Sequence, residues 1–207
     1  MIEDYKENSE RILWKGKPNK SVYIKERIFS PLALIALVWL IFDTAFIGIT
    51  FKSSANSIPI MVMFFAMHLI PVWLYLGRVV FSFVSWNNTE YMVTDKAVYI
   101  TMGIFTTTCD RKTFQEITNT SVHQGIIDKS HDVGDVFITT GFRTTNKGAT
   151  VRCGINFIDI EDYMKVYKLI NKTGTDIYSD TQYPNDLRPK ENHGYRTKYN
   201  RDDNGWN

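Results

Sequence analysis

An acid and a histidine inside two long apolar stretches are the residues best placed for chemistry. Asp43 lies eight residues before Phe51, and His68 lies nine residues after Pro59. If both stretches are helical, the rise of about 1.5 Å per residue places the two side chains roughly 12–14 Å from the same end. They are expected to meet, either as a hydrogen bond that joins the helices, which is the favoured interpretation, or as an ion-coupling pair.

The rest of the sequence shows no pattern typical of catalysis or metal binding. It contains no GxxxxGK[ST] phosphate loop, GxSxG elbow, HExxH helix or DxDxDG calcium loop. We therefore expect no enzyme activity, metal, cofactor or small-molecule substrate, and reduced rather than disulfide-bonded cysteines. No ligand spacing connects the histidines or cysteines, which are His68, His123, His131, His193, Cys109 and Cys153.

The charge is too balanced for a nucleic-acid-binding protein. The 207 residues include 24 Lys and Arg against 22 Asp and Glu, which gives a formal net charge of +2. Nucleic-acid-binding domains usually present a basic face or stripe. We therefore expect no nucleic-acid partner.

Two groups of basic residues are candidates for contact with anionic lipid headgroups, where each contributes about 1 kcal/mol. One group precedes the first apolar stretch, and the other lies in loops of the C-terminal half. A mixed, solvated surface is the alternative, because acids such as Asp95 and Asp110 lie beside them. The candidates are Lys15, Lys17, Lys20, Lys25, Arg27, Lys96, Arg111 and Lys112.

The two apolar stretches predict a transmembrane hairpin. They run over residues 29–51 and 59–84, and with their connection they include only three formally charged side chains. Each exceeds the roughly 20 residues that a helix needs to cross a membrane. Ser30–Pro31 is typical of a helix start, and Pro71 predicts a kink in the second helix.

The distribution of positive charge predicts the orientation of this hairpin. Seven Lys or Arg precede the first stretch, whereas the connection between the stretches has one. By the positive-inside rule, both termini are cytoplasmic and the chain is a multi-pass protein of the cell membrane. The polar, acidic N-terminus is not typical of a secretory signal, so the first helix is expected to stay in the mature protein.

From Thr89 onward, short β-rich runs alternate with turn residues, which is typical of an antiparallel sandwich or barrel. In the last run, Val151, Cys153, Ile155 and Phe157 are predicted to face the core. The predicted strands are residues 90–93, 97–102, 105–110, 117–124, 126–129, 136–142 and 149–157.

An amphipathic helix is predicted after the last strand, over residues 159–172. Asp159 is its expected cap, and Gly174 its expected stop. Its predicted apolar face consists of Ile160, Tyr163, Met164, Tyr167 and Ile170.

Taken together, these elements predict a membrane α-hairpin plus a mainly-β domain of about seven strands, closed by a C-terminal helix. This is the element order of a pleckstrin-homology (PH) fold. The predicted organisation is a cytoplasmic juxtamembrane segment (1–28), a hairpin (29–84), a cytoplasmic PH-like domain (85–172) and a disordered polar tail (173–207).

The chain resembles the bacterial membrane-anchored PH-like family, formerly a domain of unknown function. The stretch Glu90–Val98 (EYMVTDKAV) is similar to that family's Y-x-[VL]-T-[DN]-x-R-V start, with Lys96 in place of Arg. The segment Glu10–Pro18 also fits, whereas Asp132–Val136 keeps one glycine of a G-x-G-x-[IV] run. The resemblance implies a PH-like fold, a membrane location and no catalytic residues.

Three hypotheses for function follow. The first is a non-enzymatic scaffold that binds a protein or peptide, or associates with itself, in a groove lined by residues 149–156 and 159–172. The second is a sensor of anionic lipid that uses the basic residues named above. The third is an accessory subunit of a membrane transport assembly that uses Asp43 and His68.

Overall fold

The structure, a computed structural model, describes residues 2–50, 58–145 and 148–182. The chain divides into two compact units, each described here by itself. The helical unit is Lys20–Asn87, and the β unit combines Met1–Asn19 with Asn88–Asn207. The prediction of a separate juxtamembrane segment over 1–28 was therefore wrong, because its first part folds with the C-terminal half.

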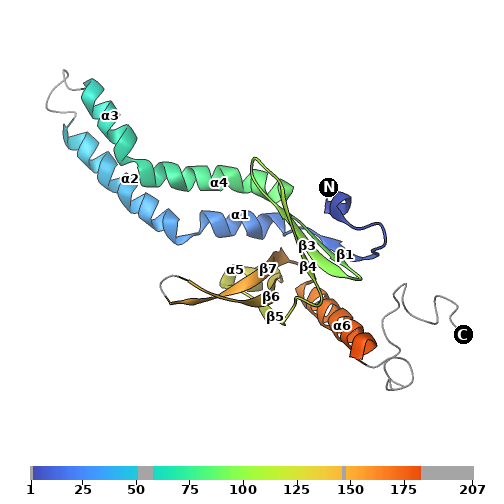
Figure 1. The fold of residues 1–207 in the computed structure, drawn as a ribbon. Coiled ribbons are helices and arrows are strands. Elements are labelled where there is room, and N and C mark those ends of the chain that lie inside the picture. Colours follow the sequence, from blue (N-terminus) through green and yellow to red (C-terminus); the bar gives the residue numbers. More distant parts are fainter. Residues whose placement is uncertain (1, 51–57, 146–147, 183–207) are drawn as a thin grey trace, which may run out of the picture. The chain divides into compact units, whose positions relative to one another are not determined.

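The helical unit confirms the first apolar helix and the predicted kink in the second. The second stretch is two helices bent by 58° at Leu69 (Figure 1). Pro71 follows this break, and a proline removes a helical hydrogen bond and clashes with the preceding turn. The predicted connection falls largely on 51–57, outside the described residues. The helices are α1 (Lys20–Ile28), α2 (Pro31–Thr50), α3 (Ile58–His68) and α4 (Ile70–Asn88).

Helix α2 is long and apolar enough to cross a membrane, and α3 with α4 meets the same criterion only if the bent pair forms one span. Large apolar side chains of α2 are exposed, including Leu34 at 68% and Val38 at 66%. A helix that is apolar on every face needs an apolar environment around it.

Helix α1 was not predicted, and it packs against α4 within the helical unit. The hydroxyls of Tyr23 and Ser85 lie 2.9 Å apart, and the Tyr75 hydroxyl donates to the carbonyl of Ile28 at 3.2 Å. These bonds extend the helical unit beyond the predicted hairpin, because they join the segment before α2 to the end of the second stretch.

The β unit contains two antiparallel sheets, with strand orders β1-β2-β3-β4 and β5-β6-β7. Seven strands were expected, and the described residues form seven, but they are not the same seven. The unpredicted β1 pairs with β2, with Ile12 opposite Thr94 and Gly16 opposite Tyr91. The strands are β1 (Ile12–Gly16), β2 (Glu90–Thr94), β3 (Ala97–Met102), β4 (Thr108–Thr113), β5 (Asn119–His123), β6 (Gly134–Thr144) and β7 (Thr150–Ile160).

The strand predicted over 126–129 is wrong, since these residues belong to the short helix α5 (Ile126–His131). A side-chain bond at the first turn explains the helix, because Asp128 Oδ2 accepts from the Gly125 N–H at 2.7 Å. Ile126, whose apolarity favoured a strand, is 91% exposed.

The core of the β unit lies among the inner faces of the sheets and helix α6 (Tyr163–Gln182). The rings of Tyr91 and Phe157 stack there at 4.7 Å between centroids. Ile155 and Phe157 are buried as predicted, but Val151 and Met164 are 49% and 44% exposed. The buried core residues include Val93, Val98, Ile100, Val136, Ile138, Ile160, Val166 and Ile170.

Helix α6 begins and ends later than predicted. Asp159 is not its cap, because this residue has a φ of 55° at the end of β7, and the Asp162 carbonyl accepts the first amides of the helix. Gly174 does not stop it. A glycine inside a helix costs about 1 kcal/mol relative to alanine, but packing on this face, where Thr173 is buried, offsets that cost. The predicted disorder over 173–207 is thus wrong for 173–182, and 183–207 lie outside the described residues.

Candidate functional site

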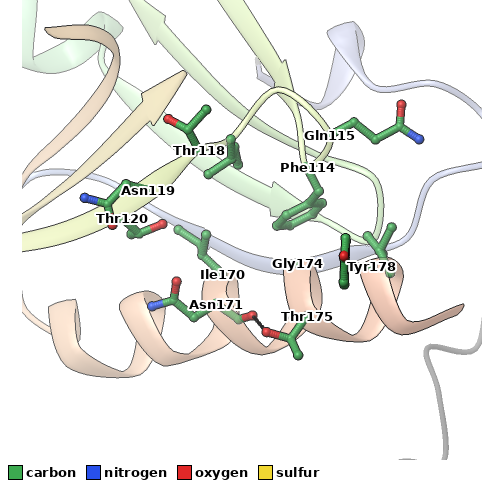
Figure 2. A pocket seen from close by; sticks show the side chains of 12 residues that line it. Phe114, Gln115, Thr118, Asn119, Thr120, Ile170, Asn171, Gly174, Thr175 and Tyr178 are labelled. Carbon is green, nitrogen blue, oxygen red and sulfur yellow. Dashed lines mark hydrogen bonds between the residues drawn. The ribbon is translucent and has the colours of Figure 1, made fainter. Parts of the chain in front are cut away.

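A groove of about 560 Å³ lies in the β unit, between α6 and the chain that leads from β4 into β5. Figure 2 shows Asn119 and Thr120 on one side and Ile170, Asn171 and Thr175 of α6 on the other. None of its twelve lining residues is charged. Apolar side chains contribute part of the surface, namely those of Phe114, Ile117, Ile170 and Ile177.

The strand beside this groove lies at the edge of its sheet. Strand β5 pairs with β6, and within the described residues no strand pairs with its other edge. An edge strand presents backbone N–H and C=O groups that can pair with an added strand. The uncharged groove and this edge together match the way in which extended peptides add to a sheet, with side chains entering pockets beside it.

The scaffold hypothesis placed the groove partly on other residues. Of its two predicted ranges, 159–172 contributes Ile170 and Asn171 to the lining, whereas 149–156 of the last strand contributes none. α6 packs on β5 and β6, and the opposite side of the groove is lined from β5 and the segment before it. The alternation of residues along β7 did not show on which side of the sheet the helix would pack. The feature of the sequence that could have located the groove is in β5, where Asn119 and Thr120 place polar side chains on a predicted strand.

Most basic residues predicted to contact lipid in the β unit are held by carboxylates. Arg111 lies 2.9 Å from Glu10 and 3.2 Å from Glu7, and Lys17 lies 3.2 Å from Glu90. Lys15 lies 2.7 Å from Glu3, which raises the pKa of Lys15. The Lys96 ammonium donates to the Ser9 hydroxyl at 2.8 Å, and Lys112 is partly exposed on β4. These contacts reduce the charge available to a polyanion.

Glu10 and Arg111 form the centre of a buried polar network that fixes the N-terminal segment to the sheet. The Glu10 carboxylate accepts from Thr94 at 2.7 Å, from Tyr99 at 3.0 Å and from Arg111 at 2.9 Å, and Arg111 Nε donates to the Tyr99 hydroxyl at 2.8 Å. Burial alone would raise the pKa of Glu10, but these donors and the guanidinium charge leave the pKa below its usual range. Burial raises the pKa of Tyr99 to about 12.

On the same face of this sheet, next to Tyr99, the start of the chain adds a second small core. Helix η1 (Ile2–Tyr5) inserts Ile2, 1% exposed, against Met92, Ala97 and Tyr99. The Ile2 amide donates to the Glu90 carboxylate at 3.0 Å. The N-terminal residues are therefore structural, and they occupy the surface that the basic residues of β1 and β4 would otherwise present.

The remaining predicted lipid contacts lie on α1 in the helical unit. The Lys20 ammonium lies 4.8 Å from the centre of a Trp86 ring, and the Arg27 guanidinium lies 4.1 Å from the Tyr23 ring. Lys25 is on the same helix. Both pairs have the geometry of cation–π interactions.

Asp43 and His68 meet, as their matching depths predicted. His68 Nδ1 lies 2.8 Å from Asp43 Oδ1, and Asp43 is 1% exposed. Asp43 Oδ2 has no hydrogen-bond partner in the described part of the chain. The histidine lies at the end of α3, where the helix break frees backbone carbonyls, and the Trp39 indole donates to one of them, that of His68, at 2.8 Å.

One comparison with known proteins identifies the chain. Residues 21–173, more than half of the 207, match the family model described as the bacterial PH domain. No curated protein and no solved structure matches the chain. The matched region ends within α6 and begins after η1 and β1, so the N-terminal strand lies outside it. The two antiparallel sheets and C-terminal helix agree with this match, and the chain belongs to the bacterial PH domain family.

Proposed function

We propose that this chain is a non-enzymatic, membrane-anchored scaffold whose β unit binds an extended peptide segment of a protein partner. Domains of the PH type are interaction modules that bind lipids or proteins. The observation that carries the proposal is the uncharged groove of about 560 Å³ beside the outer edge of β5, with which no strand of the described residues pairs.

The lining of the groove indicates the kind of peptide that fits. A bound segment would pair its main chain with β5 and place apolar side chains against Phe114 and Ile170. The amides of Gln115 and Asn171 can bond to polar groups of the peptide. Because no lining side chain is charged, the affinity should change little with salt, unlike that of a phosphate-binding site.

Binding of anionic lipid by the β unit has less support. Arg111, Lys15 and Lys17 each lie within 4.0 Å of a carboxylate, so the local charge is already largely compensated. Lipid contact by Lys20, Lys25 and Arg27 of α1 is compatible with the proposal, since these residues would support anchoring rather than recognition.

The proposed anchor is α2 together with the bent pair α3–α4. The exposure of the apolar side chains of α2 and the rarity of charge in both stretches support it. Both termini would then face the cytoplasm. Impermeant thiol labelling of intact cells tests this: a cysteine placed at residue 54 should react and one at residue 8 should not, in a background without Cys109 and Cys153. Labelling at residue 8 would contradict the orientation.

The peptide site is tested with the full-length chain in detergent and a displayed library of unstructured peptides. Peptides that bind should protect the β5 amides from hydrogen exchange, because strand addition pairs them. Asn171→Arg places a long cation in the groove and should weaken binding at least tenfold.

Met164→Arg is the matched control, since it adds the same charge to an exposed position of α6 outside the groove. Equal loss in both variants, or binding without new protection of β5, would exclude the proposed site. A preference for anionic vesicles that survives Asn171→Arg would favour the lipid alternative instead.

A further inference from the structure

Three side chains with metal-binding atoms converge where β5 leads through α5 into β6. They are His123, Asp128 and Asp135, and one ligand atom from each lies within 4.8 Å of the other two. His123 and Asp135 are directly opposite each other in the register of β5 and β6. Asp128 lies in the first turn of α5. Sequence spacing did not reveal this group, because the register that joins its ends follows from the strand pairing.

The carboxylate of Asp128 points to a missing partner. Asp128 is 2% exposed, and its Oδ1 has no hydrogen-bond partner among the described residues. A buried carboxylate oxygen without a donor is costly, because nothing compensates for its loss of hydration. A cation beside Asp128 would supply the missing contact to this oxygen.

Two of the three ligands are already oriented by backbone donors. Asp128 Oδ2 accepts from the Gly125 N–H at 2.7 Å, and Asp135 Oδ1 accepts from the Asp159 N–H at 3.0 Å. Such bonds to ligating carboxylates are typical of the shell around a metal site. His123 is exposed, so the ion would have a route from solvent.

We propose that His123, Asp128 and Asp135 form a binding site for a divalent transition-metal cation, with water completing its coordination. One imidazole and two carboxylates suit Zn²⁺ or Mn²⁺, whereas Ca²⁺ prefers oxygen ligands alone. The three ligand atoms, which lie within 4.8 Å of one another, must approach further to reach metal–ligand distances of about 2.0–2.2 Å. His123 is the exposed member of the three, so its side chain has room to rotate toward the two carboxylates.

The site would act on the strand that lines the groove. β5 begins at the groove with Asn119 and ends at His123, so the cation would fix the far end of the strand and its connection to β6. We expect the ion to stabilise the β5–β6 pair. This inference does not depend on whether the groove binds a peptide.

The test uses the full-length chain in detergent, stripped with a chelator and titrated with ZnCl₂, MnCl₂ and CaCl₂ by calorimetry. One Zn²⁺ or Mn²⁺ per chain is expected to bind at this site, and binding should raise the melting temperature. His123→Ala and Asp128→Asn should each weaken that binding at least tenfold and remove the thermal shift. Asp128→Asn keeps an acceptor for the Gly125 N–H, so the turn should still fold.

His131→Ala is the matched control, because His131 is an exposed histidine at the end of α5 outside the cluster. It should leave the affinity unchanged. Absence of Zn²⁺ and Mn²⁺ binding up to millimolar concentration overturns the proposal, as does binding that survives His123→Ala. A preference for Ca²⁺ that is insensitive to His123→Ala also overturns it.

Discussion

Two buried carboxylates, Glu10 of the β unit and Asp43 of the helical unit, are held in different ways. In the β unit, Glu10 accepts hydrogen bonds from Thr94, Tyr99 and Arg111, and both of its oxygens are used. In the helical unit, Asp43 has His68 at 2.8 Å, while its other oxygen has no hydrogen-bond partner in the described part of the chain.

This contrast distinguishes a carboxylate with a structural role from one whose role is not fixed by its contacts. A buried charge with donors on both oxygens is held rigidly, and loss of one partner strongly destabilises the fold. A buried pair between two helices in an apolar setting is worth less, and it leaves capacity for a proton or an ion. We therefore assign Glu10 to folding, and a role of Asp43 beyond its hydrogen bond to His68 stays a hypothesis.

The largest expected effect is on the folding of the β unit, and it comes from removing residues 2–16. The deletion takes away β1, Ile2 and Glu10, and it leaves Arg111 and Tyr99 without their partner. We expect loss of a folded β unit even though the whole family-matched region remains. Limited proteolysis of the full chain in detergent measures this. A chain that ends at Gln182 is the control, and unchanged resistance in the 2–16 deletion would contradict a structural role for the N-terminal segment and its Glu10.

Arg111→Ala should destabilise the β unit by about 3 kcal/mol, because it leaves the Glu10 carboxylate buried and uncompensated. Hydrogen exchange of the β2–β4 amides in the full chain reports the local free energy of opening. Lys112→Ala, on the next position of β4, should change it by less than about 0.5 kcal/mol. Similar values for the two variants would mean that Glu10 is not held mainly by Arg111.

Acid should weaken the β unit through the same carboxylate. Hydrogen bonds and charge outweigh burial and hold the pKa of Glu10, and likewise that of Glu90, below the ordinary value of 4.5. The unfolded chain then binds protons first, so this stability is complete above about pH 4.5 and is lost as the pH falls through the lower native pKa. In thermal unfolding, the melting temperature of Glu10→Gln should fall less steeply between about pH 5 and 3 than that of the unchanged protein. An unchanged slope would remove Glu10 as a source of the acid sensitivity.

The smallest effect is expected in the helical unit. A double-mutant cycle with Asp43→Ala and His68→Ala should give a coupling of roughly 0.6–1.7 kcal/mol, the range measured for hydrogen bonds between membrane helices. Unfolding in bicelles by added SDS measures it. A larger coupling would make this pair a structural lock like that of Glu10. If Asp43→Asn instead abolished a transport flux or the binding of a partner protein while stability stayed unchanged, the transport hypothesis would be supported.

Local patterns in the sequence were sufficient for several elements. The long apolar stretch predicted α2, and the turn residues around Asp95 marked the β2–β3 hairpin. Equal depth in two apolar helices predicted the contact between Asp43 and His68, and Pro71 predicted the bend. In each case the information lies within one or two helices or a short hairpin, where residue periodicity and backbone chemistry decide the conformation.

Other features depended on contacts between distant residues. Strand β1 exists because Ile12 and Gly16 meet Thr94 and Tyr91 more than seventy residues later in the chain. α6 continues through Gly174 because tertiary packing outweighs helix propensity. The groove beside β5, and the meeting of His123 with Asp135, exist only once strand order and register are set. The sequence by itself determined the apolar helices, the hairpin turns and the balance of charge. The tertiary structure decided which edge strand lines the groove and which carboxylates find a partner, because both depend on contacts between distant residues that no local pattern encodes.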